Sequence, residues 1–189
     1  MRVFAALIPP EHVIEDLDDF LSPRRDDPAA SRLGWSRPES WHLTLAFMGG
    51  ASAEAVERLV ERLAEVLPDT AAPTVQVRGG GAFPVVERAR VLYAGVADPS
   101  GSLEQLSQRV RSAAAVTGCA PDGRAFLPHL TLARSRRPIE ATKWVRVIQT
   151  YVGPRWQADE VAVVESHLGH GRPRHVVLER VPLGPGTGA

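Results

Sequence analysis

The sequence predicts an α+β fold of two lobes, in which two antiparallel or mixed sheets surround a central cleft and the helices lie outside. Strand-like and helix-like segments alternate along the 189 residues, and many connections are short and rich in glycine and proline. That pattern suits antiparallel pairing better than a doubly wound parallel sheet. One pentapeptide also occurs twice, over residues 42–46 and 129–133, which indicates two related halves. We expect residues 1–183 to form a single bilobal domain and 184–189 a flexible tail.

Apolar spacing and local stop signals predict the elements of the first half in order. A buried strand over residues 2–8 ends at Pro9 and Pro10, and a helix over 11–21 gives way to a polar loop from Pro23. The further elements of this half are a short strand over 33–35, a strand over 40–48, and a helix between Ser52 as its N-cap and Pro68.

The second half repeats this order. A strand over residues 74–77 is followed by Gly79–Gly81, which we expect to form a flexible break or a bulge, because glycine inside a strand weakens it. The remaining predicted elements are strands over 91–96 and 127–134, a helix over 102–117 closed by Gly118, a weak helix over 142–151, and strands over 160–168 and 175–181.

Charge and cysteine content exclude some classes of protein. The 22 cationic and 22 anionic side chains cancel, which argues against a protein that coats nucleic acid by bulk electrostatics. Lys143 is the only lysine, so an anion site here would use arginine or histidine. Cys119 stands alone, which leaves no internal disulfide and no paired Cys/His zinc pattern. With no apolar run long enough for a membrane span, we expect a cytoplasmic monomer.

The repeated pentapeptide His-Leu-Thr-Leu-Ala carries the candidate chemistry. Side chains two positions apart share one face of a strand, so His42 lies with Thr44, and His129 lies with Thr131. The leucines between them face the other way, toward the core. If the two strands lie side by side, two histidines and two threonines meet in one cleft.

Two converging imidazoles indicate paired general acid–base catalysis. Histidine is neutral or protonated near pH 7, so one ring can deprotonate water while the other protonates a leaving oxygen. Threonine hydroxyls can donate hydrogen bonds to oxygens of a phosphoryl centre. We expect no metal and no cofactor, because each strand offers one good ligand without a converging carboxylate or thiolate. The alternative that both histidines are half-exposed strand residues without a role is disfavoured by the duplication.

The extended motifs resemble those of a known family. They read His-Leu-Thr-Leu-Ala-Phe from His42 to Phe47, and His-Leu-Thr-Leu-Ala-Arg from His129 to Arg134. The chain is similar in these motifs to the two-histidine (2H) phosphoesterases, specifically the LigT-like RNA 2′,3′-cyclic phosphodiesterases, formerly called 2′-5′ RNA ligases. The resemblance runs from residue 2 to about residue 183, and includes the opening strand and the segment 161–168.

The resemblance implies a metal-independent hydrolysis that opens a terminal 2′,3′-cyclic phosphate of RNA to a 2′-phosphomonoester. It makes His42 the general acid at the leaving O3′ and His129 the general base for water. This assignment follows from motif order alone, and the reverse stays open. The other implied roles are phosphate binding by Thr44, Thr131 and Arg134, and stacking of Phe47 on the terminal base.

Strand geometry conflicts with two of these roles. Phe47 and Arg134 each follow their histidine by an odd offset, which would point them to the opposite face of a regular strand. Either each strand ends or bulges before them, or the two side chains reach the cleft around its rim. Gly49-Gly50 and Ser135-Arg136 indicate strand ends.

Several other readings stay open. The same site could ligate RNA ends through a 2′-5′ bond reversibly, or act on small cyclic nucleotides or ADP-ribose cyclic phosphate. A non-catalytic nucleotide- or RNA-binding module is an alternative of another class. Among further residues, Trp35 is a candidate for the nucleotide pocket, while Arg124, Arg136 and Arg137 are candidates for its rim. The three histidines near the C-terminus are expected in a polar loop rather than a metal site: His167, His170 and His175.

Overall fold

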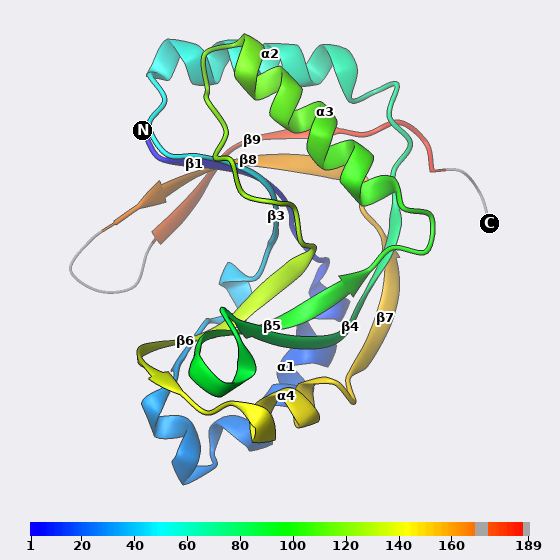
Figure 1. Cartoon of the computed structure of the whole chain (residues 1–189). Coiled ribbons are helices and arrows are strands. Elements are labelled where there is room, and N and C mark those ends of the chain that lie inside the picture. Colours follow the sequence, from blue (N-terminus) through cyan, green and yellow to red (C-terminus); the bar gives the residue numbers. More distant parts are fainter. Residues whose placement is uncertain (169–173, 187–189) are drawn as a thin grey trace.

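The computed structural model describes residues 1–168 and 174–186, and its strands form one curled sheet (Figure 1). The strand order is β7-β4-β5-β6-β3-β1-β8-β9, with the short β2 beside β6, and the pairs between these strands are antiparallel. The strands are β1 (Val3–Leu7), β2 (Gly34–Trp35), β3 (Leu43–Met48), β4 (Thr74–Phe83), β5 (Ala89–Ala97), β6 (His129–Ile139), β7 (Val152–Gln157), β8 (Glu160–His167) and β9 (Arg174–Pro182).

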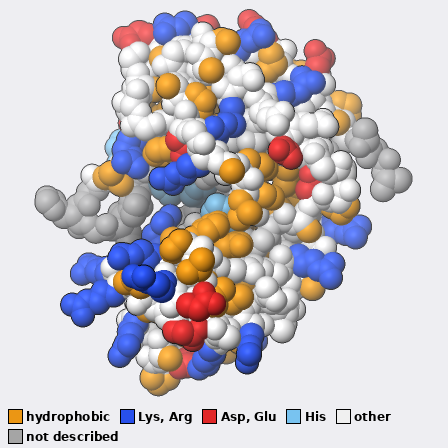
Figure 2. All heavy atoms as spheres, in the orientation of Figure 1, with side chains coloured by type: hydrophobic (Ala, Val, Ile, Leu, Met, Phe, Trp, Pro, Cys, Tyr) orange, Lys and Arg blue, Asp and Glu red, His pale blue; other side chains and the backbone are white. Residues whose placement is uncertain are grey.

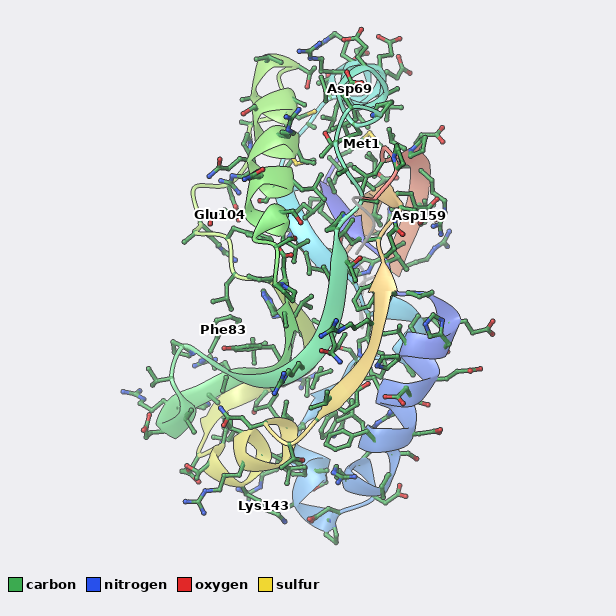
Figure 3. All side chains as sticks on the ribbon, turned by 90° about the vertical axis from the view of Figure 1, so that its right-hand side faces the viewer. Met1, Asp69, Phe83, Glu104, Lys143 and Asp159 are labelled. Atoms are coloured by element: carbon green, nitrogen blue, oxygen red, sulfur yellow. The ribbon has the colours of Figure 1, made fainter. Side chains whose placement is uncertain are left out.

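The helices cover the outside of the sheet, and the chain passes repeatedly between the lobes. They are α1 (Glu11–Arg25), α2 (Ala53–Val66), α3 (Ser102–Val116) and α4 (Thr142–Ile148), with short 3₁₀ turns at Pro28–Arg32, Pro38–Ser40 and Val86–Arg88. Helices α2 and α3 pack together and contact β9 and β3, whereas α4 contacts β4. Although α1 directly follows β1, it lies beside β7 in the other lobe (Figures 1 and 3). No helix in the described part of the chain is long and apolar enough to cross a membrane.

The predicted α+β fold with two lobes is confirmed, with one refinement to its sheets. Strands β7-β4-β5-β6 form one half and β3-β1-β8-β9 the other, and a single residue pair between β3 and β6, Leu43 with Leu130, joins them into one sheet. The named strands pair only in the antiparallel sense within residues 1–168 and 174–186. Gly184, the first residue of the expected tail, pairs with Ala71, and residues 187–189 lie outside the described part.

Several predicted boundaries were wrong. Helix α1 continues through Pro23 to Arg25, where the arginine side chain bonds back to Asp18. Strand β4 does not end at residue 77 but continues through Gly79–Gly81 with a bulge, one of the two alternatives expected for these glycines. Glycine is required at position 80, because a side chain there would collide with the carbonyl of Tyr93. The helix expected to reach residue 151 ends at Ile148, and the sequence prediction missed the strand β7 that follows.

Each of the two motif strands carries a bulge at the same place. In β3, Ala5 of β1 pairs with Ala46 and Ala6 pairs with Thr44, so Leu45 is the extra residue. In β6, Leu92 of β5 pairs with Ala133 and Tyr93 pairs with Thr131, so the extra residue is Leu132. The bulge puts two successive residues on the core face, and the alternation then resumes in the opposite phase.

Both bulges have their freed carbonyl groups satisfied. The carbonyl of Leu45 accepts a hydrogen bond from the buried hydroxyl of Ser107 on α3, at 2.7 Å. The carbonyl of Leu132 accepts from the backbone N–H of Ser36, at 2.8 Å. A buried carbonyl without a donor would be destabilising, so these contacts stabilise the irregular geometry that follows each His-x-Thr sequence.

We predict that Ser107→Ala lowers the free energy of unfolding by about 1–3 kcal/mol, because it leaves the Leu45 carbonyl buried without a donor. Urea unfolding followed by circular dichroism measures this change. The matched control is Ser112→Ala, an exposed serine on the same helix, which should change stability by less than about 0.5 kcal/mol. Equal stabilities of the two variants would contradict the role assigned to Ser107.

Candidate active site

The repeated motifs meet where the two half-sheets join. With Leu43 opposite Leu130, the same antiparallel register places His42 opposite Thr131 and Thr44 opposite His129. Both leucines are fully buried in the main core, so their sequence neighbours lie on the other face of the sheet. Figure 2 shows that face as a hollow between the lobes, with histidine inside it and arginine or lysine on both rims. The structure thus brings the predicted histidines and threonines together.

Both motif histidines are held in the same way. Nδ1 of His42 lies 2.7 Å from the carbonyl oxygen of Ser40, and Nδ1 of His129 lies 2.7 Å from that of Leu127. A carbonyl can only accept, so in each ring Nδ1 carries the hydrogen. The Nε2 atom of each neutral ring is then left with its lone pair, as a base. Once protonated, the same atom can donate.

Aromatic rings pack against both imidazoles. Phe4 of β1 stacks on His42, with ring centroids 4.5 Å apart and planes inclined by 24°. Phe83 of β4, labelled in Figure 3, meets His129 edge-on at 5.1 Å, and Tyr93 of β5 does so at 5.4 Å. These contacts limit ring rotation and exclude water from one side of each imidazole.

Burial lowers the pKa of both imidazoles, which favours their neutral forms in the free protein. The pKa of His42 is lowered to about 4, mainly by burial and in smaller part by the charges of His175, His129 and Arg134, while the hydrogen bond to Ser40 acts in the opposite direction. The pKa of His129 is also lowered, mainly by burial and then by Arg134. No carboxylate within the described part of the chain raises either pKa, so an anion entering the hollow would favour protonation.

The bulges resolve the positions of Phe47 and Arg134. In β3, Leu45 and Ala46 are both buried and Phe47 is half-exposed like Thr44. In β6, Leu132 and Ala133 are buried and Arg134 is exposed. Both residues therefore return to the face of the histidines, as the bulge alternative predicts. The expected strand end is found only at Met48, since β6 continues to Ile139.

The weaker candidates have other surroundings. Trp35 packs edge-on against Trp144 at 5.6 Å, which explains it as a packing residue. Arg124 is exposed and pairs with Asp122, and Arg136 and Arg137 are exposed on β6. Nothing in these contacts distinguishes the three arginines from solvated surface charges.

The two described C-terminal histidines have different neighbours. His167 pairs with Glu165 at 3.1 Å, whereas His175 lies against His42, and His170 is outside the described residues. Within residues 1–168 and 174–186, no three His, Cys, Asp or Glu side chains gather in an arrangement that could hold a metal ion.

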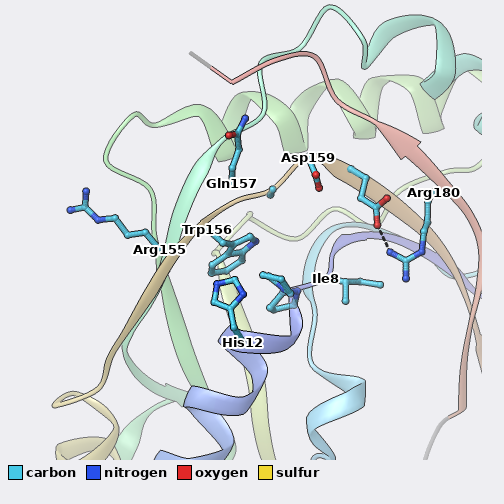
Figure 4. Close-up of a pocket in the computed structure, with 11 residues that line it drawn as sticks. Ile8, His12, Arg155, Trp156, Gln157, Asp159 and Arg180 are labelled. Carbon is cyan, nitrogen blue, oxygen red and sulfur yellow. Dashed lines mark hydrogen bonds and ion pairs between the residues drawn. The ribbon is translucent and has the colours of Figure 1, made fainter. Parts of the chain in front are cut away.

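A separate pocket of about 480 Å³ contains none of the predicted site residues (Figure 4). It lies between the start of α1 and strands β7 and β9, with Ile8, His12, Trp156 and Arg180 in its wall. Arg180 is paired with Glu160, and the wall also carries Arg155 and Asp159, so cationic and anionic side chains are mixed there. The histidine hollow, rather than this pocket, holds the groups suited to acid–base chemistry.

Sequence reasoning missed three residues near the site. Phe4 and His175 surround His42, and the guanidinium of Arg2 lies 5.2 Å from the ring centre of Phe47. The opening strand is apolar and buried throughout, so no local pattern in the sequence marks Phe4 as a residue of the site. The position of His175 depends on the pairing of β8 with β9 and of β1 with β8, which no local pattern reveals.

Comparison with known proteins agrees with this geometry. A sequence model of the 2′-5′ RNA ligase superfamily matches residues 9–170. The RNA 2′,3′-cyclic phosphodiesterase of Aquifex aeolicus is 29% identical over 79% of this chain and 81% of its own length. That of Escherichia coli is 32% identical over 77% of each chain. The crystal structure of E. coli LigT without ligand superimposes with a TM-score of 0.74 at 26% identity, over 97% of both chains.

The fold and paired histidines define a two-histidine phosphoesterase. The chain belongs to the 2′-5′ RNA ligase superfamily. Other matching crystal structures of E. coli LigT contain phosphate or 3′-AMP.

We predict that inorganic phosphate raises the pKa of His42 and His129, because an anion in the hollow favours the protonated imidazoles and offsets their burial. Histidine NMR titrations with and without phosphate measure both pKa values. The resonances of His12, exposed on α1, are the internal control and should not respond. In Arg134→Met the phosphate effect should weaken; an unchanged pKa of both motif histidines in the parent protein would contradict an anion site here.

Proposed function

We propose that this protein hydrolyses the terminal 2′,3′-cyclic phosphate of RNA to a 2′-phosphomonoester, by two-histidine acid–base catalysis without a metal. The observation that carries the proposal is the matched pair of imidazoles, each with Nδ1 bonded to a carbonyl and Nε2 available on the same face of the sheet. The relatives named above are RNA 2′,3′-cyclic phosphodiesterases, which supports RNA as the substrate class.

In the proposed reaction, water attacks phosphorus and the bond from phosphorus to O3′ breaks. Neutral His129 accepts the proton of the attacking water at Nε2. His42, protonated at Nε2, donates its proton to the departing O3′. One proton is taken and one is given, so the product carries a 2′-phosphate and a 3′-hydroxyl, and the two histidines have exchanged protonation states.

Because the pKa of His42 is lowered, substrate binding is needed to protonate this residue in the proposed reaction. In the free protein at neutral pH, His42 is neutral and cannot act as the acid. The cyclic phosphate is an anion, so its arrival beside the ring favours uptake of a proton. The acid is therefore formed mainly when substrate is bound, which limits proton donation without substrate.

The remaining motif residues bind the substrate in this proposal. Thr44 and Thr131 donate hydrogen bonds to the non-bridging phosphate oxygens, each from a position next to the Leu43–Leu130 pair that joins the two motif strands. Arg134, close enough to lower the pKa of both rings, offers a planar pair of donors to the same oxygens. Phe47 offers a ring to the terminal base, with Arg2 on one side of it.

We also propose that the protein acts as a monomer in the cytoplasm, as expected from its sequence. Reversible 2′-5′ ligation uses the same groups, with an RNA 5′-hydroxyl in place of water. A substrate panel of RNA ends, free cyclic nucleotides and ADP-ribose cyclic phosphate separates these substrates. Tight RNA binding without turnover would identify a non-catalytic module instead.

We predict that His42→Ala and His129→Ala each reduce kcat by about 10²–10⁴-fold, the usual contribution of a general acid or base. The assay uses an RNA oligonucleotide ending in 2′,3′-cyclic phosphate, in EDTA, with the 2′-phosphate product resolved by chromatography. His12→Ala, on exposed α1, is the control and should retain activity. Undiminished turnover by the double variant, or none by the parent protein, would refute the proposal.

We predict that Arg134→Lys reduces kcat/KM about tenfold or more, because an ammonium group keeps the charge but loses the bidentate fork. Steady-state kinetics on the same RNA measure the loss. Arg109→Lys, an exposed arginine on α3, provides the matched control. If kcat/KM of both variants equalled that of the parent protein, Arg134 would not bind the phosphate through a bidentate contact.

A further inference from the structure

A third imidazole, that of His175, lies at the candidate site. It comes from β9, far along the chain from both motifs, and its ring meets His42 edge-on, with centroids 5.1 Å apart and planes inclined by 81°. The same ring meets Phe4 at 5.1 Å and 77°. Phe4, His42 and His175 thus form a compact cluster of three rings, in which His175 is half-buried.

This cluster is the main difference between the two halves of the site. His42 and His129 share the same motif, the same contact of Nδ1 with a carbonyl, and two ring neighbours each. The rings beside His129 are those of Phe83 and Tyr93, and neither carries a basic nitrogen. Beside His42, one of the two rings is an imidazole that can itself become a cation, with a pKa that burial holds below its usual value.

We propose that His175 is a positioning residue for His42, holding its ring against Phe4 and controlling, through its own charge, how readily His42 takes up a proton. The contact is geometric and exists in the free protein. Its consequence for catalysis rests on the proposed function, in which proton transfer by His42 is part of the reaction.

The charges around His42 support this inference. The groups that act on it are His175 from β9 and His129 and Arg134 from β6, and all three are basic. From β1 the neighbour is Phe4, which is uncharged. Burial is the main reason that the pKa of His42 is low, and among the three charged neighbours His175 has the largest effect. Removing the imidazole of His175 should therefore raise the pKa of His42, while the burial effect remains.

Two substitutions distinguish the packing of the His175 ring from the effect of its charge. His175→Phe keeps a ring against His42 and Phe4 but cannot be protonated, whereas His175→Ala removes both. The matched control is His167→Ala, in the same hairpin, whose partner Glu165 lies away from the imidazole cluster. Thermal unfolding checks that all three variants fold. NMR titration gives the pKa of His42 in each, and steady-state kinetics on the cyclic phosphate RNA give kcat and KM over a pH series.

We expect the pKa of His42 to rise in both His175 variants and to stay unchanged in His167→Ala. We expect kcat of His175→Ala to fall on the order of tenfold with little change in KM, because a misplaced ring slows proton transfer more than binding. His175→Phe should recover most of kcat at its best pH, with its pH profile displaced in line with the new pKa of His42.

An unchanged pKa of His42 in both variants would overturn the electrostatic part, and a kcat for His175→Ala equal to that of the parent would overturn positioning. The NMR measurement needs no turnover. A parent protein without activity therefore refutes the proposed function, while a displaced pKa of His42 in the same samples still supports the coupling to His175.

Discussion

The pairing of Leu43 with Leu130 is the contact on which the candidate site depends. It is the one register pair between β3 and β6 in the described part of the chain, and it joins the two halves of the sheet. Both leucines are fully buried, so the hydrophobic effect fixes which face of each strand is inward. A shift of either strand by one residue would move its histidine into the core, so the position of both histidines is as strongly determined as the core itself.

The bulges satisfy a second geometric requirement of the site, which a regular strand could not meet. A site that needs side chains at the first, third and sixth positions of one segment requires a change of phase between the third and the sixth. The extra residues Leu45 and Leu132 supply it, and both remain buried, so the irregularity costs little apolar contact. The donors to their carbonyls come from different places, a helix side chain in one half and a backbone N–H in the other. The two halves thus reach the same local geometry with different support.

Local patterns in the sequence predicted much of this structure, and long-range contacts supplied what the patterns missed. Alternation identified the polar faces of the motif strands, and the odd offsets of Phe47 and Arg134 indicated an irregularity, with a bulge as one of the alternatives. The same reasoning missed β7, whose Gly153 and Pro154 interrupt any strand pattern. It also placed His175 in a polar loop, because its contact with His42 requires three successive strand pairings to be known. The roles of the site residues remain predictions until they are tested by substitution.

The carbonyls of Ser40 and Leu127 have a further consequence for how this site can vary. They fix the tautomer of each histidine through the main chain, two residues before the ring, so the side chains at these positions take no part in that bond. A screen of point substitutions at either position could find full activity and overlook a contact that both imidazoles need. Only a change in the path of the backbone, or replacement of the amide by an ester, would alter the acceptor. The two carbonyls that fix the histidine tautomers therefore cannot be tested by side-chain substitution. For the same reason, natural substitutions of these side chains leave the two hydrogen-bond acceptors in place.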